Sequence, residues 1–198
     1  MKLNLFLAFA LTMPVAASPA LRNWIERFPN VREIQGVASH NLRYRFFFRV
    51  HDFDVAIVLS AKVAPEVLKS RAYSELVHDG AITETKFMMY IHSARGAGNF
   101  SLHCDANEFL RLLNLIATHE LFSLTYDKPQ LEVRPIMLDS YWIVANRTIL
   151  TDETIVEREA GTSVPVDDFV KELWQIANQR MQSMPVADQQ TFAGLTER

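Results

Sequence analysis

Cysteine is nearly absent from this sequence, and its scarcity bounds the fold and the compartment. Cys104 is the only cysteine among 198 residues, so the chain cannot form an internal disulfide. Small animal-secreted modules usually depend on several disulfides, whereas a chain of this length can bury about 70% of its unfolded surface. Hydrophobic residues make up 49% of the chain. We therefore expect a core-stabilised globular protein, more typical of a bacterial envelope than of a disulfide scaffold.

Long hydrophobic runs are also lacking. A membrane-spanning helix needs about 20 apolar residues, and the longest apolar run, from Leu3 to Ala17, has about fifteen. It follows the positive Lys2 and ends in small residues, which are typical of a signal-peptidase site. Residues 1–17 are therefore predicted to be a cleaved signal peptide, which directs the mature protein to the periplasm or out of the cell. The alternative interpretation is an ordinary N-terminal core helix.

The chain has no excess of positive charge. It carries 20 Lys and Arg against 23 Asp and Glu, which gives a net charge of −3 at pH 7. Loss of the signal peptide, which contains Lys2, makes the mature chain one unit more negative. Nucleic-acid-binding proteins draw most of their affinity from a basic face. General binding to polyanions is therefore not expected.

The local motifs of common catalytic and metal sites are missing. HExxH, paired CxxC, EF-hand, GxSxG and SxxK spacings are absent, as is the Lys-Ser/Thr end of a P-loop. His51, Asp52 and Asp54 could ligate a metal ion, but a metal site needs further ligands, and Asp and His favour tight hairpin connections, which is the interpretation that we adopt. Cys104 follows His103 directly, and neighbouring strand residues face opposite sides, which favours a buried, inert thiol. We assign no catalytic residue, no metal site and no cofactor.

What the sequence does contain is regular apolar patterning, which predicts a single α+β domain over residues 18–182. Segments of helical periodicity are interspersed with segments of strand alternation, and no period of 20–50 residues repeats. This order predicts a mostly antiparallel sheet of roughly five to seven strands with the helices packed on one face. Asp105 and Glu108 have the spacing of a helix capping box. Residues 183–198 are predicted to be a loosely ordered tail, in which Phe192 and Leu195 could dock.

Strict alternation from Leu42 to Ala61 predicts a β-hairpin with one dry face. Even-numbered residues from Leu42 to Val50 and odd-numbered residues from Val55 to Ala61 are apolar, apart from the amphipathic Tyr44. With a four-residue loop at 51–54, Val50 pairs with Val55. A slip of one residue would turn every apolar side chain to the wrong face, so the parity is well specified.

The opposite face of this hairpin carries a basic band. The band consists of Arg43, Arg45, Phe47, Arg49 and Lys62. Arginine and aromatic residues are enriched at protein interfaces, and a local basic patch stands out in an acidic protein. We expect the band to bind an anionic partner, which is a protein, a peptide or a membrane-surface group, with an acidic protein or peptide favoured. The alternative is that the protein's own helices or solvent cover it.

A second predicted hairpin, residues 85–104, carries a candidate polar cleft. Its members are Tyr90, His92, Ser101 and His103, which share one face if Ile91 pairs with Phe100. Side chains two apart on a strand stand about 6–7 Å apart, whereas a nucleophile and its base must approach to about 3 Å. A catalytic triad is therefore not expected here.

Taken together, these features predict an exported, non-enzymatic binding protein. It would act through protein–protein interaction as an inhibitor, an immunity-type protein or an envelope adaptor. The alternative is a small envelope-directed hydrolase that uses a Ser/His/Tyr-lined cleft on the hairpin at residues 85–104. The absence of a convergent catalytic set favours the binding protein.

The predicted signal peptide has a direct test. When the full chain is expressed in a bacterium, the protein in the periplasmic fraction is expected to begin at Ser18, because the small residues before it form the cleavage site. Intact-mass measurement identifies this N-terminus. A variant in which Ala17 is replaced by Arg is the control and should retain Met1. Export without cleavage, or no export, would contradict the prediction.

Overall fold

The computed structural model describes residues 26–28, 39–70, 81–119, 122, 142–149, 152–159 and 164–197. The predicted signal peptide, residues 1–17, lies outside these ranges. So do most of residues 18–28, whose apolar spacing predicts a helix, and residues 31–38, whose pattern predicts a short strand.

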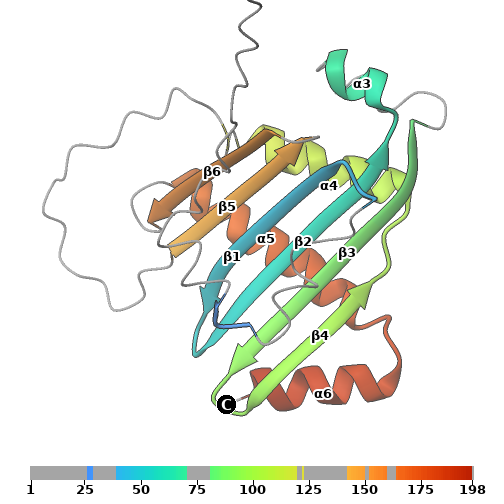
Figure 1. Ribbon diagram of the computed structural model, residues 1–198. Helices are drawn as coiled ribbons and strands as arrows, with labels where there is room; N and C mark the ends of the chain where they lie inside the picture. Colours follow the sequence, from blue (N-terminus) through green and yellow to red (C-terminus); the bar gives the residue numbers. More distant parts are fainter. Residues whose placement is uncertain are drawn as a thin grey trace, which may run out of the picture.

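A six-stranded antiparallel sheet lies at the centre of the described structure (Figure 1). Its strands are β1 (Leu42–Val50), β2 (Phe53–Val63), β3 (Ile82–Ser93), β4 (Gly96–Leu102), β5 (Trp142–Ile149) and β6 (Asp152–Glu159). They are ordered β4-β3-β2-β1-β5-β6, and every neighbouring pair is antiparallel. The predicted α+β class with an antiparallel sheet is confirmed.

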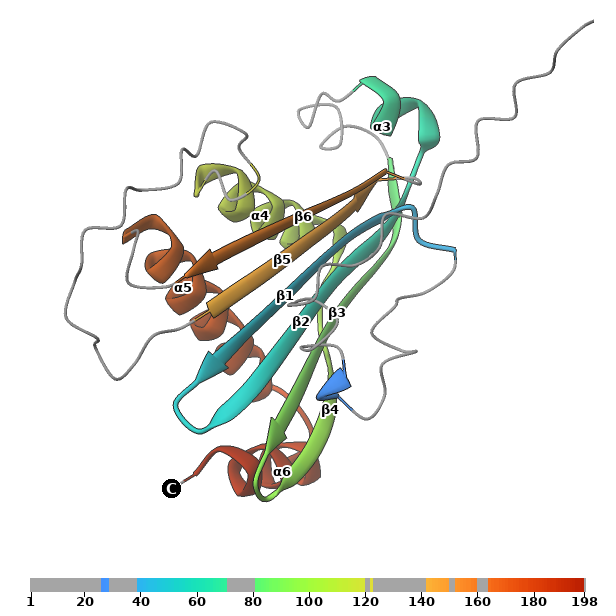
Figure 2. The same ribbon diagram turned by 60° about the vertical axis from the view of Figure 1, so that its left-hand side comes forward.

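The helices with described bounds are α3 (Pro65–Ser70), α4 (Ala106–Thr118), α5 (Val164–Met181) and α6 (Val186–Thr196). Helices α4 and α5 lie on the same face of the sheet, and α6 lies beside the β3–β4 hairpin (Figures 1 and 2). None of the helices in the described ranges is long and apolar enough to cross a membrane.

The main core lies between the sheet and the α4–α5 layer. Phe109, Leu112, Leu113 and Ile116 form the buried stripe of α4, and its N-terminus carries the predicted capping box. The ring of Phe46 on β1 lies 5.1 Å from the ring of Phe169 on α5. Burial of each such side chain contributes about 1.5–3 kcal/mol, so this layer dominates the stability of the fold.

The parity predicted for the first hairpin is confirmed, but its register is wrong by two residues. Even-numbered β1 residues and odd-numbered β2 residues belong to the core. Val50 pairs with Phe53, however, and the loop has two residues, His51 and Asp52. His51 has a φ of 51°, and the favoured two-residue hairpin turns have a positive φ at this first loop position. The shorter loop buries Phe53, whose ring lies 5.7 Å from that of Trp174.

The second hairpin is displaced from its predicted register in the same way. Met89, and not Ile91, pairs with Phe100, and the loop consists of Ala94 and Arg95. Gly96 follows the loop with a φ of 134°, a conformation that residues with a Cβ rarely adopt. A shift of two residues preserves the side-chain faces, so apolar alternation could not separate the two registers.

Residues 183–198, predicted as a loose tail, contain helix α6. The ring of Phe192 lies 5.8 Å from that of Phe100 on β4, and Leu195 belongs to the core. The space for Leu195 comes from Gly98, because a Cβ on this glycine would lie 2.7 Å from Leu195 Cδ1. The helix was missed because its apolar residues do not form one face at helical spacing, and because its order depends on this long-range contact.

The fit of α6 against β4 predicts opposite effects at two glycines. Gly98→Ala should lower the free energy of unfolding by about 1 kcal/mol, because the new methyl group overpacks against Leu195 and Phe100. Gly194→Ala is the matched control: a Cβ there meets nothing within 4 Å, and alanine should stabilise the helix by about 0.5–1 kcal/mol. Urea unfolding measures both. Equal stabilisation by both substitutions would contradict the docked position of α6.

Candidate functional site

The face of the sheet opposite α4 and α5, here called the outer face, carries the polar residues of β1 to β3. Its centre is covered: Phe47 is 0% exposed and Arg45 is 7% exposed. One contact that covers it is Phe28, whose ring lies 6.2 Å from that of Phe47. The predicted basic band is therefore not a continuous exposed surface, because its central aromatic residue is packed inside the protein.

At the loop end of β1 and β2, the outer face carries a buried carboxylate held by two arginines. Asp54 is 5% exposed. Arg49 Nε donates to Asp54 Oδ1 at 2.8 Å, and Arg27 Nη1 donates to Oδ2 at 3.3 Å. The hydrogen bond to Asp54 raises the pKa of Arg49. Because the arginines occupy both carboxylate oxygens, Asp54 is not available to a metal ion at the hairpin connection.

At the other end of β2, Lys62 faces Glu84 across the β2–β3 pair. Its Nζ lies 3.5 Å from Glu84 Oε1, and both side chains are about half exposed. Exposed pairs of this kind contribute about 0–1 kcal/mol. Asp54, the partner of Arg49, and Lys62 are eight positions apart on β2, which corresponds to roughly 26 Å. The exposed parts of the basic band are therefore separate, with a buried centre between them.

Between these ends, the structure assembles a serine, a histidine and a glutamate that the sequence did not single out. His40 Nδ1 lies 2.9 Å from Ser60 Oγ, and His40 Nε2 lies 3.5 Å from Glu84 Oε2. Burial lowers the pKa of His40, and the nearby Glu84 opposes this shift only in part. Ser60 could have been noticed as the one hydroxyl in the apolar run of β2. Its pairing with His40 depends on a contact across 20 residues.

Serine, histidine and glutamate are residue types of a catalytic triad, but the serine and the histidine here are not accessible to a substrate. A nucleophile needs space for a substrate within about 3 Å of its oxygen. Ser60 is 2% exposed, and the side chain of His40 is 1% exposed. The contact is therefore a hydrogen bond between two buried polar groups, which satisfies Ser60 Oγ and His40 Nδ1.

The predicted polar cleft at residues 90–103 does not converge. Tyr90 is buried, His92 is partly buried, and Ser101 is exposed on β4. His92 pairs with Ala97, whereas Ser101 pairs with Met88, so the two stand four positions apart, or roughly 13 Å. His103 lies beyond the end of β4. Nothing in the described ranges unites these four residues around one reacting atom.

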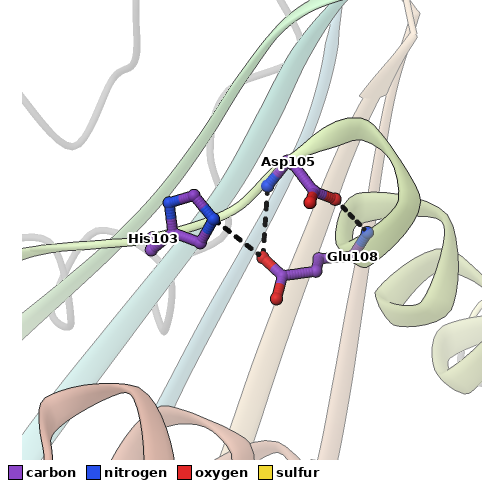
Figure 3. Close-up of side chains that lie close together, drawn as sticks. All are labelled: His103, Asp105 and Glu108. Atoms are coloured by element: carbon purple, nitrogen blue, oxygen red, sulfur yellow. Dashed lines mark hydrogen bonds and ion pairs between the residues drawn. The ribbon is translucent and has the colours of Figure 1, made fainter. Parts of the chain in front are cut away.

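His103 instead approaches the start of α4 (Figure 3). Its Nε2 lies 3.7 Å from Glu108 Oε2, and one ligand atom each from His103, Asp105 and Glu108 fall within 4.8 Å of one another. Asp105 and Glu108 already form the capping box of α4, and Arg180 Nη2 pairs with Glu108 Oε1. A cation would have to compete with this arginine and with the helix cap. The capping function accounts for the cluster, which carries no metal assignment.

Cys104 is partly buried between His103 and the α4 cap. Burial, followed by the negative charges of Glu108 and Asp105, raises the pKa of the thiol to about 12. The thiolate, which is the reactive form, is therefore scarce at neutral pH. This arrangement agrees with the inert thiol that the sequence favoured.

A depression of about 330 Å³ lies where the two hairpin loops meet the end of α6. Its lining residues are His51, Asp52, Phe53, Ser93, Ala94, Arg95, Leu195, Thr196 and Glu197. Arg95 donates to the main-chain carbonyl of Glu197, which ties the β3–β4 loop to the C-terminal side of α6. The depression does not include Ser60 or His40, so it offers no access to their contact.

Comparisons with protein-family models, with curated proteins and with solved structures find no match to this chain. The chemistry of its own residues is therefore the basis for assigning a function.

The burial of Ser60 predicts that it does not react. A fluorophosphonate, which labels activated serines, should leave the native protein unmodified, because the Ser60 oxygen is covered. Mass spectrometry measures the labelling, and Ser60→Ala is the control. Labelling of the native chain that disappears in Ser60→Ala would show an accessible nucleophile and contradict this conclusion.

Proposed function

We propose that this chain is an exported, non-enzymatic binding protein that acts through protein–protein interaction, as an inhibitor, an immunity-type protein or an envelope adaptor. The observation that carries the proposal is the burial of the Ser60–His40 contact, a nucleophile–base pair that no substrate reaches. The signal-peptide pattern of residues 1–17 supports export to the periplasm or beyond.

The exposed ends of the basic band are the proposed contact points. The side chains of Arg49 and Lys62 are 52% and 51% exposed. Arginine and lysine at the rim of an interface steer an acidic partner and contribute about 1 kcal/mol or less each, because solvent screens them. The partner is therefore an acidic protein or peptide that contacts one or both ends. Arg45 and Phe47 support the face from inside and do not touch the partner.

The hydrolase alternative has one observation in its favour, which is the Ser60–His40–Glu84 contact chain. It would require the outer face to open during turnover. Binding remains the better proposal, since it needs no such change.

The proposal predicts a charge-dependent interaction. The double variant Arg49→Gln/Lys62→Gln should capture a partner from periplasmic extract about fivefold less well than the mature wild-type chain, because two exposed cations are lost. Quantitative mass spectrometry after pull-down measures the capture, and the single variants identify the end that is used. Capture should also weaken as salt rises.

Lys171→Gln is the matched control, because it removes an exposed lysine from α5 on the other side of the sheet. It should capture the partner as well as the wild type does. Equal capture by the double variant and the wild type would remove the basic ends from the proposal. Failure of the wild-type chain to retain a partner above background would overturn the binding function itself.

A further inference from the structure

Two consecutive residues before β1 tie the start of that strand to the end of β2. Asn41 Nδ2 donates to the Val63 carbonyl at 2.7 Å, and the Val63 N–H donates to Asn41 Oδ1 at 2.8 Å. His40 Nδ1 makes the contact with Ser60 Oγ described above. We call these residues the His40–Asn41 clasp.

The clasp replaces main-chain pairing that β1 does not supply. Pairing between β1 and β2 stops at Leu42 and Ala61, so Val63 has no partner on β1. The β2–β3 register also shifts between Lys62 and Val63. The side-chain amide of Asn41 thus satisfies both main-chain groups of Val63 at a point where the sheet is irregular. Loss of the clasp would leave these groups to solvent.

His40 is the part of the clasp that can change charge. Its ring is buried, and its Nε2 makes no hydrogen bond to the residues that the structure describes. The charged groups near it are Arg43 on β1, Lys62 on β2, and Glu84 and Lys86 on β3. Glu84 favours a charged imidazole, but it is half exposed and also pairs with Lys62. The other cations and the dry surroundings disfavour that charge.

We propose that the His40–Asn41 clasp is an acid-sensitive latch: protonation of His40 opens it and frees the start of β1 from the end of β2. A charged imidazole needs more solvation than the closed clasp provides, because the ring is buried and the carboxylate beside it, Glu84, is half exposed and shared with Lys62. When the clasp opens, water reaches the His40 ring, and the hydrogen bonds of His40 to Ser60 and of Asn41 to Val63 are lost. The inference concerns the fold's response to pH and does not depend on the proposed binding function.

The direction of the pH effect follows from the histidine's protonation in the two states. In the closed clasp, the pKa of His40 is lowered from its ordinary value of 6.5, chiefly by burial. The open state therefore binds the proton more readily, and lower pH favours opening. The clasp is fully stable above about pH 6.5 and weakens as the pH falls through the lowered pKa of His40.

Hydrogen exchange at the Val63 amide tests the latch, because Asn41 accepts its hydrogen bond only when the clasp is closed. Between pH 7.5 and pH 5, Val63 protection, corrected for intrinsic exchange, should fall relative to that of Ile57 in the middle of β2. The limiting fall is about tenfold for each unit by which the pKa of closed His40 lies below 6.5. No change at Val63 would overturn the proposal.

Three variants separate the latch from general acid sensitivity. His40→Gln cannot titrate and should show no pH-dependent opening, whereas His103→Gln removes an exposed histidine and should behave as the wild type does. Glu84→Gln should open more readily in acid, because the carboxylate that favours the charged ring is gone. The same fall in His40→Gln as in the wild type would overturn the proposal. If His40→Gln does not fold, an NMR titration of wild-type His40 decides: a pKa at or above 6.5 overturns it.

Discussion

Burial of the central strands on both faces is the constraint on which the rest of this structure depends. The inner face of β1 and β2 packs against α4 and α5, and the outer face is covered at its centre, where Phe47 packs against Phe28. A polar group on such a face cannot rely on water and must be satisfied by the protein. Asp54 is satisfied by Arg27 and Arg49, and Ser60 is satisfied by His40. Arg27 and His40 are the two partners that do not belong to a strand of the sheet, and both precede β1 in the chain. Residues before the hairpin therefore satisfy the buried polar groups of its outer face.

This constraint explains which parts of the fold the sequence could predict. Side-chain parity in β1 and β2 followed from alternation, because the inner face is uniformly apolar. The capping box of α4 followed from the spacing of Asp105 and Glu108, because a cap is a local interaction. Hairpin register did not follow, since displacement by two residues preserves every face. It was decided by the burial of Phe53 against Trp174, a contact between residues 121 positions apart.

The candidate site was harder to predict than the fold, for the same physical reason. Arg43, Arg45, Phe47 and Arg49 share one face in the sequence pattern and in the structure, yet the pattern carries no sign of what covers that face. The cover depends on single side chains such as Phe28 and His40, which have no periodic signature. Helix α6 was missed likewise, because Gly98 and Leu195 fit one another only after β4 and the C-terminal residues have come together.

The separation of the exposed cations limits how a partner could engage this protein. Arg49 is anchored to a buried carboxylate, so its guanidinium is held in place, whereas Lys62 pairs with an exposed Glu84 and keeps most of its freedom. A pre-positioned arginine loses less side-chain entropy on binding than a mobile lysine does. Arg27 and Arg49 both contact Asp54 at the loop end of β1 and β2. Of the two ends, this one therefore has the cations that are better positioned to bind an acidic group. The same arginines cannot move far without exposing Asp54, so the proposed recognition at this end and the stability of the outer face rest on one carboxylate.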